Sequence, residues 1–312
     1  MISIAMTTYN GERFLREQLD SILAQTYANW ELHICDDCST DGTIAILNEY
    51  AQNDSRVHVH LNDHNLGFKK NFEKTISFCN GEYTALSDQD DIWLPNHLEF
   101  LLKSIGKNAL SSANAVLVDS DGKEMGRLLN EVEELYFLPE GTKFLYRILF
   151  KSACIQGASQ LIRTDFLKQW LPIPEKVAYH DAWFSVCALL SGGLSYSFDV
   201  ITKYRQHGSN ITFVNHNKID EALGDKLKRI IRKFFGGIEV DRFAYRDELE
   251  ARFGRSDKNF SDICSLFDHL REKKTGLKDI KMFWKNYENI TTMHSHRHFI
   301  KKMIGWLRWK EI

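Results

Sequence analysis

The hydrophobic pattern of the first hundred residues alternates between two kinds of segment. Residues 2–6 form a short apolar run typical of a buried strand, and residues 14–23 place apolar side chains at the i, i+4, i+7 and i+8 spacing of one helix face. The same two patterns recur, with strands predicted at residues 30–35, 57–61 and 83–87 and helices beginning near Ser39 and over residues 68–78. This rhythm predicts βαβ units built around a mostly parallel sheet.

The pattern loosens after Pro95. We predict a helix at residues 96–105, a strand at 115–119, mobile loops around the acidic residues 131–134, a further strand at 159–163 and a helix at 180–190. From residue 218 onward the spacing is helical, with no clear strand pattern. The sequence therefore predicts an α/β domain over residues 1–215 and a helical, basic C-terminal region over residues 216–312.

Composition separates these two parts by charge. The chain has 43% hydrophobic and 26% charged residues and a net charge of -2, which favours a folded protein and gives no general attraction to nucleic acid. Residues 218–312 carry 22 Lys and Arg against 15 Asp and Glu, whereas the preceding residues carry 18 against 27. The first residues lack a basic segment followed by a long apolar one, and no stretch has the length and apolarity of a spanning helix, so we expect a cytoplasmic protein.

The last residues of the chain suggest a surface-binding helix. Residues 294–312 contain five Lys and Arg against one acidic residue, with Ile300, Met303, Ile304 and Leu307 on one helical face. Such a helix suits peripheral contact with the anionic inner face of a membrane. A terminal helix that packs its apolar stripe on the protein explains the same pattern, and the sequence leaves both readings open.

Three polar clusters directly follow predicted strands. Residues 7–11 read Thr-Thr-Tyr-Asn-Gly, residues 36–42 Asp-Asp-Cys-Ser-Thr-Asp-Gly and residues 88–91 Asp-Gln-Asp-Asp. Each alone suits an ordinary turn or helix cap. Ligands of open α/β sheets, however, bind at the carboxyl ends of the strands, and three such clusters on one edge concentrate negative charge that folding does not require. Asp88 and Asp90 suit a ribose hydroxyl and a hard divalent cation, so we predict Mg²⁺ or Mn²⁺ bridging a diphosphate.

These motifs, in this order, resemble the family 2 inverting glycosyltransferases with the GT-A fold. The resemblance rests on residues 7–10, 36–43, 65–67 and 87–93 and covers about the first two thirds of the chain. His180-Asp181 and residues 204–207, Tyr-Arg-Gln-His, look most like bacterial rhamnosyltransferases of surface polysaccharide synthesis. The resemblance implies a nucleotide-diphospho-sugar transferase fold, a Rossmann-like mixed sheet flanked by helices, with a helical C-terminal extension.

The resemblance also implies roles for individual residues. Asp181 would be the general base of an inverting transfer, and His180 before it, where an acidic residue is commoner, competes for that role. Mn²⁺ or Mg²⁺ would be held by Asp90 and His207. The nucleotide would be bound by Thr7, Tyr9, Asp37, Lys70 and Asp88. The donor or acceptor sugar would be contacted by Asp91, Trp93, Gly157, His180 and Trp183. The diphosphate would face Arg205 or Asn210.

The resulting prediction is a divalent-metal-dependent transfer of sugar from dTDP-rhamnose or a UDP-hexose to a saccharide acceptor, lipid-linked acceptors included. Two alternatives stay open. A nucleotidyltransferase binds similar ligands, but the first strand is not followed by a Gly-rich basic loop, and a non-catalytic nucleotide-sugar-binding protein has no need of Asp181. Cys35 and Cys38 form a C-x-x-C motif, but the other cysteines are isolated and two carboxylates separate the thiols, which disfavours a zinc or redox site.

Overall fold

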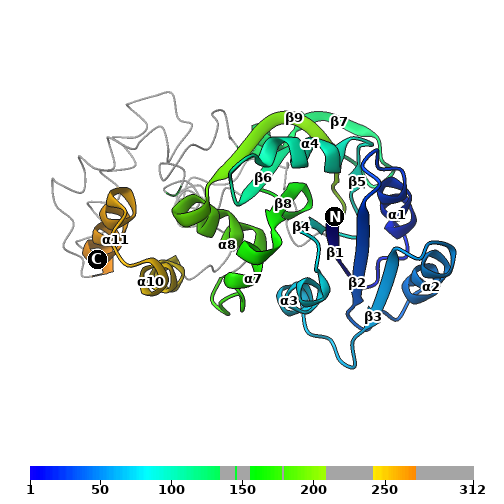
Figure 1. The fold of residues 1–312 in the computed structure, drawn as a ribbon, viewed down its shortest axis with the longest axis horizontal. Coiled ribbons are helices and arrows are strands. Elements are labelled where there is room, and N and C mark those ends of the chain that lie inside the picture. The colour runs from blue at the N-terminus through cyan, green and yellow to red at the C-terminus, as the bar shows by residue number, and fades with distance from the viewer. Residues whose placement is uncertain (134–144, 146–154, 178, 209–241, 272–312) are drawn as a thin grey trace, which may run out of the picture. The chain divides into compact units, whose positions relative to one another are not determined.

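Four parallel strands and three helices build the N-terminal half of the sheet in the computed structural model, which describes residues 1–133, 145, 155–177, 179–208 and 242–271 (Figure 1). The strands are β1 (Ile2–Thr8), β2 (Trp30–Asp36), β3 (Val57–Leu61) and β4 (Tyr83–Ser87). The helices between them are α1 (Leu15–Leu23), α2 (Thr43–Asn53) and α3 (Phe68–Phe78). The strands lie in the order β3-β2-β1-β4, all parallel, which confirms the predicted βαβ alternation.

The second half of the sheet is mixed. β8 (Gln160–Arg163) runs antiparallel to β4 and to β6 (Leu110–Val118), while β9 (Leu194–Arg205) runs parallel to β6. The two-residue strand β5 (Ile92–Trp93) pairs with β9, and β7 (Glu124–Leu128) pairs with β6. The predicted strand at 115–119 is longer and begins earlier, at Leu110, and β5, β7 and β9 were not predicted. This arrangement places residues 88–91 and 205–207 next to each other, because β5 follows residues 88–91 and pairs with β9.

The core follows the period-two pattern of β1. Ile2, Ile4 and Met6 are fully buried and belong to one cluster with the apolar faces of α1, α2 and α4 (His97–Ile105). The alternate residues Ser3 and Ala5 point to the opposite face, where α3 packs on β1 and β2. Figure 1 shows α3 on the other side of these strands from α1 and α2. Both faces of the parallel strands are therefore covered, and ligand-binding residues of such a sheet are expected in the loops at the carboxyl ends of the strands.

Short elements complete the first of two units, which comprises Met1–Pro139 and Cys154–Asp220. They are α5 (Leu129–Val132), the 3₁₀ turn η1 (Gly157–Ser159), α7 (Thr164–Gln169), α8 (His180–Cys187) and the π-helical turn η2 (Ala188–Gly192). Together α8 and η2 occupy the predicted helix at 180–190. The second unit comprises Glu140–Ala153 and Glu221–Ile312.

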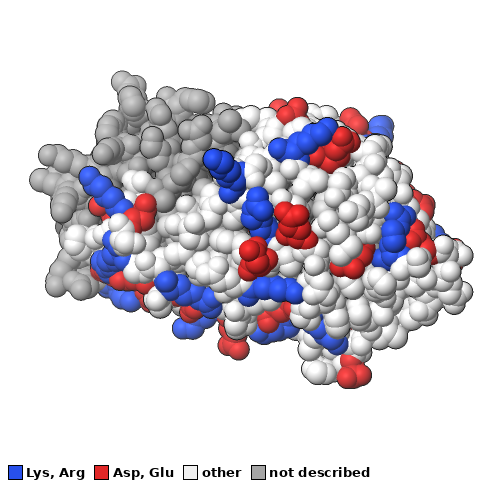
Figure 2. Space-filling model, viewed as in Figure 1, with Lys and Arg blue, Asp and Glu red and all other residues white. Residues whose placement is uncertain are grey.

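The described part of the second unit holds two helices, α10 (Arg242–Phe253) and α11 (Lys258–Arg271). Arg246, whose side chain is only 3% exposed, pairs with Glu250 and with Asp268 across the two helices. These helices agree with the helical pattern after residue 218. The basic tail at 294–312 and Asn210 lie outside the described residues, and no helix among those described is long and apolar enough to cross a membrane. Over the described part of the face in Figure 2, basic and acidic side chains are interspersed.

Candidate active site

The ends of β1 and β2 are tied together by the buried carboxylate of Asp36. Its Oδ1 accepts hydrogen bonds from Thr8 Oγ1 at 2.8 Å and Ser39 Oγ at 2.6 Å, and its Oδ2 accepts one from the Ser39 amide at 2.8 Å. Asn10, which has a positive φ of 48°, accepts the Thr40 amide on its side-chain oxygen at 2.8 Å. Part of the predicted acidic edge is therefore structural: Asp36 fixes the two loops that flank the site.

Asp37 organises the loop that precedes α3. Its Oδ1 accepts hydrogen bonds from Asn62 Nδ2 at 2.8 Å and the Leu66 amide at 2.7 Å, and its Oδ2 accepts the Gly67 amide at 2.8 Å. Gly67 has a φ of 75°, a conformation that favours glycine, so the Asn65-Leu66-Gly67 motif is set by this carboxylate. The predicted contact of Asp37 with a nucleobase stays a prediction, and it would use the remaining acceptor capacity of Oδ2.

The loop after β1 is held by the side chain of Gln89, for which the sequence predicted no role. Gln89 Oε1 accepts the Tyr9 amide at 2.8 Å, and Gln89 Nε2 donates to the Tyr9 carbonyl at 3.0 Å. Tyr9 is 51% exposed and Thr7 is half-buried, and their predicted contact with a nucleobase stays a prediction. Lys70 lies on α3 and pairs with Glu73 at 2.8 Å, on the surface.

Carboxylates and one histidine meet after β4. His207 Nε2 lies 2.8 Å from Asp90 Oδ2, so the two residues predicted to hold a metal are adjacent although 117 positions separate them in sequence. Burial, then the neighbouring charges of Asp90 and Asp181, raises the pKa of Asp88 to about 8. The charge of Asp181 thus contributes to the raised pKa of Asp88. The predicted base and the first carboxylate of the Asp88-x-Asp90 motif therefore lie in one region of the structure.

The spacing of Asp90 and His207 suits two ligands of one divalent cation. Two neighbouring ligands of an octahedral ion held at about 2.1 Å lie about 3 Å apart, close to the separation of Asp90 Oδ2 and His207 Nε2. No cluster of three or more metal-binding side chains occurs among the described residues, so a cation here would take its other ligands from a diphosphate and water.

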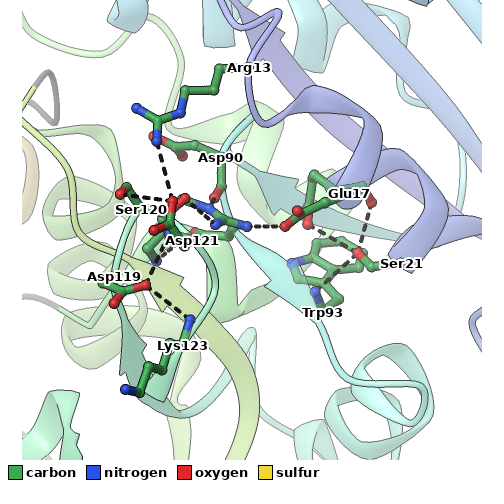
Figure 3. Close-up of polar contacts among 12 residues, drawn as sticks. Arg13, Glu17, Ser21, Asp90, Trp93, Asp119, Ser120, Asp121 and Lys123 are labelled. Carbon is green, nitrogen blue, oxygen red and sulfur yellow. Dashed lines mark hydrogen bonds and ion pairs between the residues drawn. The ribbon is translucent and has the colours of Figure 1, made fainter. Parts of the chain in front are cut away.

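Arg205 joins three segments beneath this pair, and this corrects its predicted role at the diphosphate. Its Nε donates to the Asp90 carbonyl at 2.8 Å, one terminal nitrogen donates to the Ser120 carbonyl at 3.0 Å, and the other pairs with Glu17 on α1. Figure 3 labels these three partners. Its side chain is 1% exposed and lies over the ring of Phe14, 4.8 Å from the centroid. An arginine buried in this way does not line the open site. It anchors the Asp90 loop.

All five residues that were expected to contact sugar, His180 and Gly157 included, are buried, and three of them pack in the interior through hydrogen bonds within the chain. Asp91 is fully buried, and its Oδ1 accepts the Arg205 amide at 3.1 Å; burial and the charges of Asp90 and Asp88 raise its pKa well above the usual range. Trp93 donates from Nε1 to the Ala158 carbonyl at 3.1 Å, and Trp183 donates from Nε1 to the carbonyl of Trp170 at 3.0 Å. Both indoles are at most 2% exposed. Their positions suit packing in the core, and their predicted contact with sugar stays a prediction.

Asp181 stands in the first turn of α8. Its Oδ2 accepts the Gly157 amide at 3.1 Å and its Oδ1 accepts the Ala182 amide at 2.7 Å. Burial raises the pKa of Asp181 to about 6, against the opposing effect of these amide hydrogen bonds. A carboxylate whose pKa lies near the working pH is suited to accept a proton during a reaction and release it afterwards.

His180 differs from Asp181 in both contacts and charge. It is 7% exposed, stacks on Phe72 with ring centroids 4.0 Å apart, and neither ring nitrogen has a hydrogen-bond partner. Burial lowers the pKa of His180 to about 3, so the ring is neutral near pH 7 and a weak base. Of the two residues considered for the general base, Asp181 is the one with a suitable pKa.

Comparisons with known proteins identify the family of this chain. The chain matches the model of Glycosyl transferase family 2 over residues 3–171. The Escherichia coli protein UDP-Glc:alpha-D-GlcNAc-diphosphoundecaprenol beta-1,3-glucosyltransferase WfgD is 37% identical over 260 residues, which cover 79% of this chain and 97% of that relative. EpsE of Bacillus subtilis is 34% identical over 49% of this chain and 56% of its own length, so the chain spans about half of that relative.

Solved structures support the fold. The structure of S. aureus TarS 1-349 in complex with UDP-GlcNAc aligns with a TM-score of 0.58 and 19% identity, covering 92% of this chain and 90% of that one. The mixed sheet flanked by helices is the GT-A fold predicted from the sequence motifs.

Proposed function

The chain belongs to glycosyl transferase family 2 and is a glycosyltransferase, and we propose that it moves one sugar, with inversion, from a nucleotide-diphosphate donor to a saccharide acceptor in cell-surface polysaccharide synthesis. The observation that carries the proposal is that the base candidate Asp181 lies near enough to Asp88, at the end of β4, for its charge to help raise the pKa of Asp88. A base for the acceptor and a site for the leaving diphosphate then share one edge of the sheet. The nucleotidyltransferase reading does not fit this family.

In the proposed reaction, Asp181 acts on the acceptor. Its carboxylate takes the proton of the attacking hydroxyl as the acceptor oxygen forms a bond to the anomeric carbon. The bond between that carbon and the diphosphate oxygen breaks on the opposite face, and the electron pair leaves with the nucleoside diphosphate. Burial, which raises the pKa of Asp181 to about 6, strengthens it as a base over an ordinary aspartate while leaving it ionised at neutral pH.

The remaining roles concern the donor. Asp90 and His207 would hold Mn²⁺ or Mg²⁺, which supplies positive charge to the departing diphosphate. Thr7, Tyr9, Asp37 and Lys70 would face the nucleobase or diphosphate, and Asp88 the ribose. Arg205 keeps the Asp90 loop in place through its hydrogen bond to the Asp90 carbonyl.

For the donor we favour a UDP-hexose over dTDP-rhamnose. The name of WfgD includes UDP-Glc and a GlcNAc-diphosphoundecaprenol acceptor, and that relative matches over most of both chains. A lipid-linked diphosphate saccharide is accordingly the proposed acceptor class. An acceptor of this kind is presented at the cytoplasmic face of a membrane, in line with the basic amphipathic residues 294–312.

Release of nucleoside diphosphate tests the proposal directly. UDP-, dTDP- and GDP-sugars would each be incubated with Mn²⁺, Mg²⁺ or chelator, with and without a short-chain alkyl GlcNAc diphosphate as acceptor. We expect chelator-sensitive release from one UDP-sugar and a loss of at least about 10²-fold in Asp181→Asn, which keeps the shape of the side chain but not its basicity. Binding of UDP with Mn²⁺ but no release from any donor would point instead to a non-catalytic nucleotide-sugar-binding protein.

A further inference from the structure

Side chains of α3 hold the segment that precedes α8. Lys69 Nζ donates hydrogen bonds to the carbonyl oxygens of Glu175 at 2.6 Å and Val177 at 2.7 Å. Glu73, one helical turn further along α3, accepts the Ile173 amide on Oε1 at 2.8 Å. Ile173 and Val177 are both buried. Both ends of this segment are therefore fixed to one helix.

Residues 173–177, the base-side segment, close a turn of their own. The Val177 amide donates to the Pro174 carbonyl at 3.0 Å. A lysine ammonium has three donors and no acceptor, so Lys69 can satisfy two carbonyls of this turn at once. Hydrogen bonds from a charged donor are short and about twice as strong as neutral ones. A neutral side chain of similar length would leave both carbonyls without this donor.

The contact with α3 continues from the base-side segment to the start of α8. The ring of Phe72 stacks on His180 with centroids 4.0 Å apart, and the ring of Phe68 lies 6.2 Å from the same imidazole. His180 directly precedes Asp181 in the first turn of α8. The base candidate is thus carried by a stretch of chain that rests on one side of α3.

The beginning of α3 is fixed on the donor side. Asp37, which the proposed function places at the nucleobase, accepts the amides of Leu66 and Gly67, and these two residues directly precede α3. The helix is continuous from Phe68 to Phe78. The loop set by the donor side and the segment that leads to the base are therefore attached to the same rigid element.

We propose that Lys69 is a positioning residue for the transfer reaction: it holds the base-side segment against α3 and thereby sets the distance of the Asp181 carboxylate from the bound donor. The inference rests on the proposed function. Lys69 does not touch the reacting atoms in this role and acts only through Asp181. A displacement of about 1 Å at a reacting group can cost about 10²-fold in rate, so the two hydrogen bonds of Lys69 are expected to matter for turnover and not for nucleotide affinity.

Three variants test the role of Lys69. Lys69→Met removes both donors and keeps the length of the side chain, whereas Lys69→Arg keeps the charge and the donors. Arg163→Met is the matched control, because Arg163 also donates to two carbonyls, those of Asn108 at 3.1 Å and Gly106 at 2.9 Å. Arg163 pairs in register with Tyr83 at the start of β4, at the opposite end of that strand from the candidate site.

The readouts are turnover with the donor and metal that the release panel identifies and the alkyl GlcNAc diphosphate, calorimetric binding of the matching nucleoside diphosphate with that metal, and the melting temperature. We expect Lys69→Met to lower kcat by about 10–100-fold with nucleotide affinity within about threefold of wild type. Lys69→Arg should recover at least about fivefold over Lys69→Met, since a guanidinium also donates to carbonyls. Arg163→Met should lower the melting temperature to a similar extent and leave kcat within about threefold.

A double variant separates positioning of the base from a general loss of structure. If Lys69 acts through Asp181, Lys69→Met should lower the residual turnover of Asp181→Asn by less than about threefold. An independent role would multiply the two losses. If Lys69→Met does not fold at the assay temperature, Lys69→Gln, a shorter neutral donor, should show the same pattern with a kcat loss of about 3–10-fold.

With an active wild type, each of three results overturns the inference alone: kcat of the Lys69 variant within about threefold of wild type, an equal loss in Arg163→Met, or multiplied losses in the Asp181→Asn background. Nucleotide binding weakened by the same factor as kcat would also overturn it, because Lys69 would then serve the donor. A wild type that releases nucleotide from no donor would overturn the proposed function and the inference together.

Discussion

Replacement of Arg205 by methionine tests whether one buried cation fixes the Asp90 loop. Methionine fills much of the same volume but donates no hydrogen bond. The variant leaves the carbonyls of Asp90 and Ser120 without their donor and Glu17 without its partner. The backbone amide of residue 205 is retained, so the hydrogen bond to Asp91 Oδ1 is not removed directly.

The size of the effect follows from the burial of these groups. A hydrogen bond from a charged donor contributes about 1.5–3 kcal/mol, and two such bonds to carbonyls are lost. The ion pair with Glu17 adds little, because the Glu17 side chain is 56% exposed and can be solvated. We expect the free energy of unfolding to fall by about 3–6 kcal/mol, which at about 2–4 °C per kcal/mol lowers the melting temperature of a unit of this size by roughly 6–24 °C.

Thermal unfolding and UDP binding with Mn²⁺ measure the two consequences separately. We expect Arg205→Met to bind UDP with Mn²⁺ at least about tenfold more weakly, since the Asp90 loop loses the hydrogen bond from Arg205 Nε to the Asp90 carbonyl, and Arg205→Lys to lie between it and the wild type. Arg56→Met is the control: Arg56 is partly exposed, pairs with Asp54 at 2.7 Å, and should matter by about 1 kcal/mol without altering UDP affinity. A melting temperature within 2 °C of wild type, as an order-of-magnitude threshold, would refute the anchoring role.

Two further perturbations probe the base and the loop after β1. Burial raises the pKa of Asp181 to about 6, and the base must be ionised to act. The turnover rate should therefore fall about tenfold per pH unit below pH 6 and level off above it. If the pH–rate profile of Asp181→Asn shows the same fall below pH 6, the titrating group is another residue. A methyl group on Gly11 would lie 2.3 Å from Gln89 Oε1, so Gly11→Ala should displace Gln89, release the Tyr9 backbone and weaken UDP binding by about 3–10-fold. Gln89→Ala loses the same two hydrogen bonds and should match it, and unequal UDP affinities by calorimetry would separate the two residues.

The parallel half of the fold was predictable because its signals are local. Each strand from β1 to β4 is a short apolar run, and each helix between them has one apolar stripe, so periodicity alone located them. β9 was not predicted from sequence because Leu194–Arg205 mixes serines, tyrosine and aspartate among its apolar residues. Its position is set by pairing with β6 and β5, residues far away in sequence.

The site was predictable as a set of residues rather than as a geometry. Motif resemblance selected Asp90 and His207, and the structure places them 2.8 Å apart. The same motifs could not separate Asp36 and Asp37, whose carboxylates bond to loop amides and side chains of this chain, from carboxylates that face a ligand. The fold decides which backbone amides lie near an acidic cluster, and these amides decide which carboxylate oxygens remain available to a ligand. Sequence spacing does not encode the positions of these amides.

Arg205 shows how far this dependence reaches. A sequence motif containing arginine beside a predicted diphosphate site favours a phosphate contact, since guanidinium groups bind phosphates well. In the fold, β9 ends beneath the Asp90 loop, and the Arg205 guanidinium meets a carboxylate of α1 and two carbonyl oxygens. The Arg205 guanidinium thus acts on the site from the buried side of the Asp90 loop. It opposes the accumulated negative charge of residues 88–91, where burial and mutual repulsion already raise the pKa of Asp88 to about 8. A divalent cation would supply the remaining compensation, so we expect UDP with Mn²⁺ to raise the melting temperature of this unit more than UDP alone does, as thermal unfolding would measure.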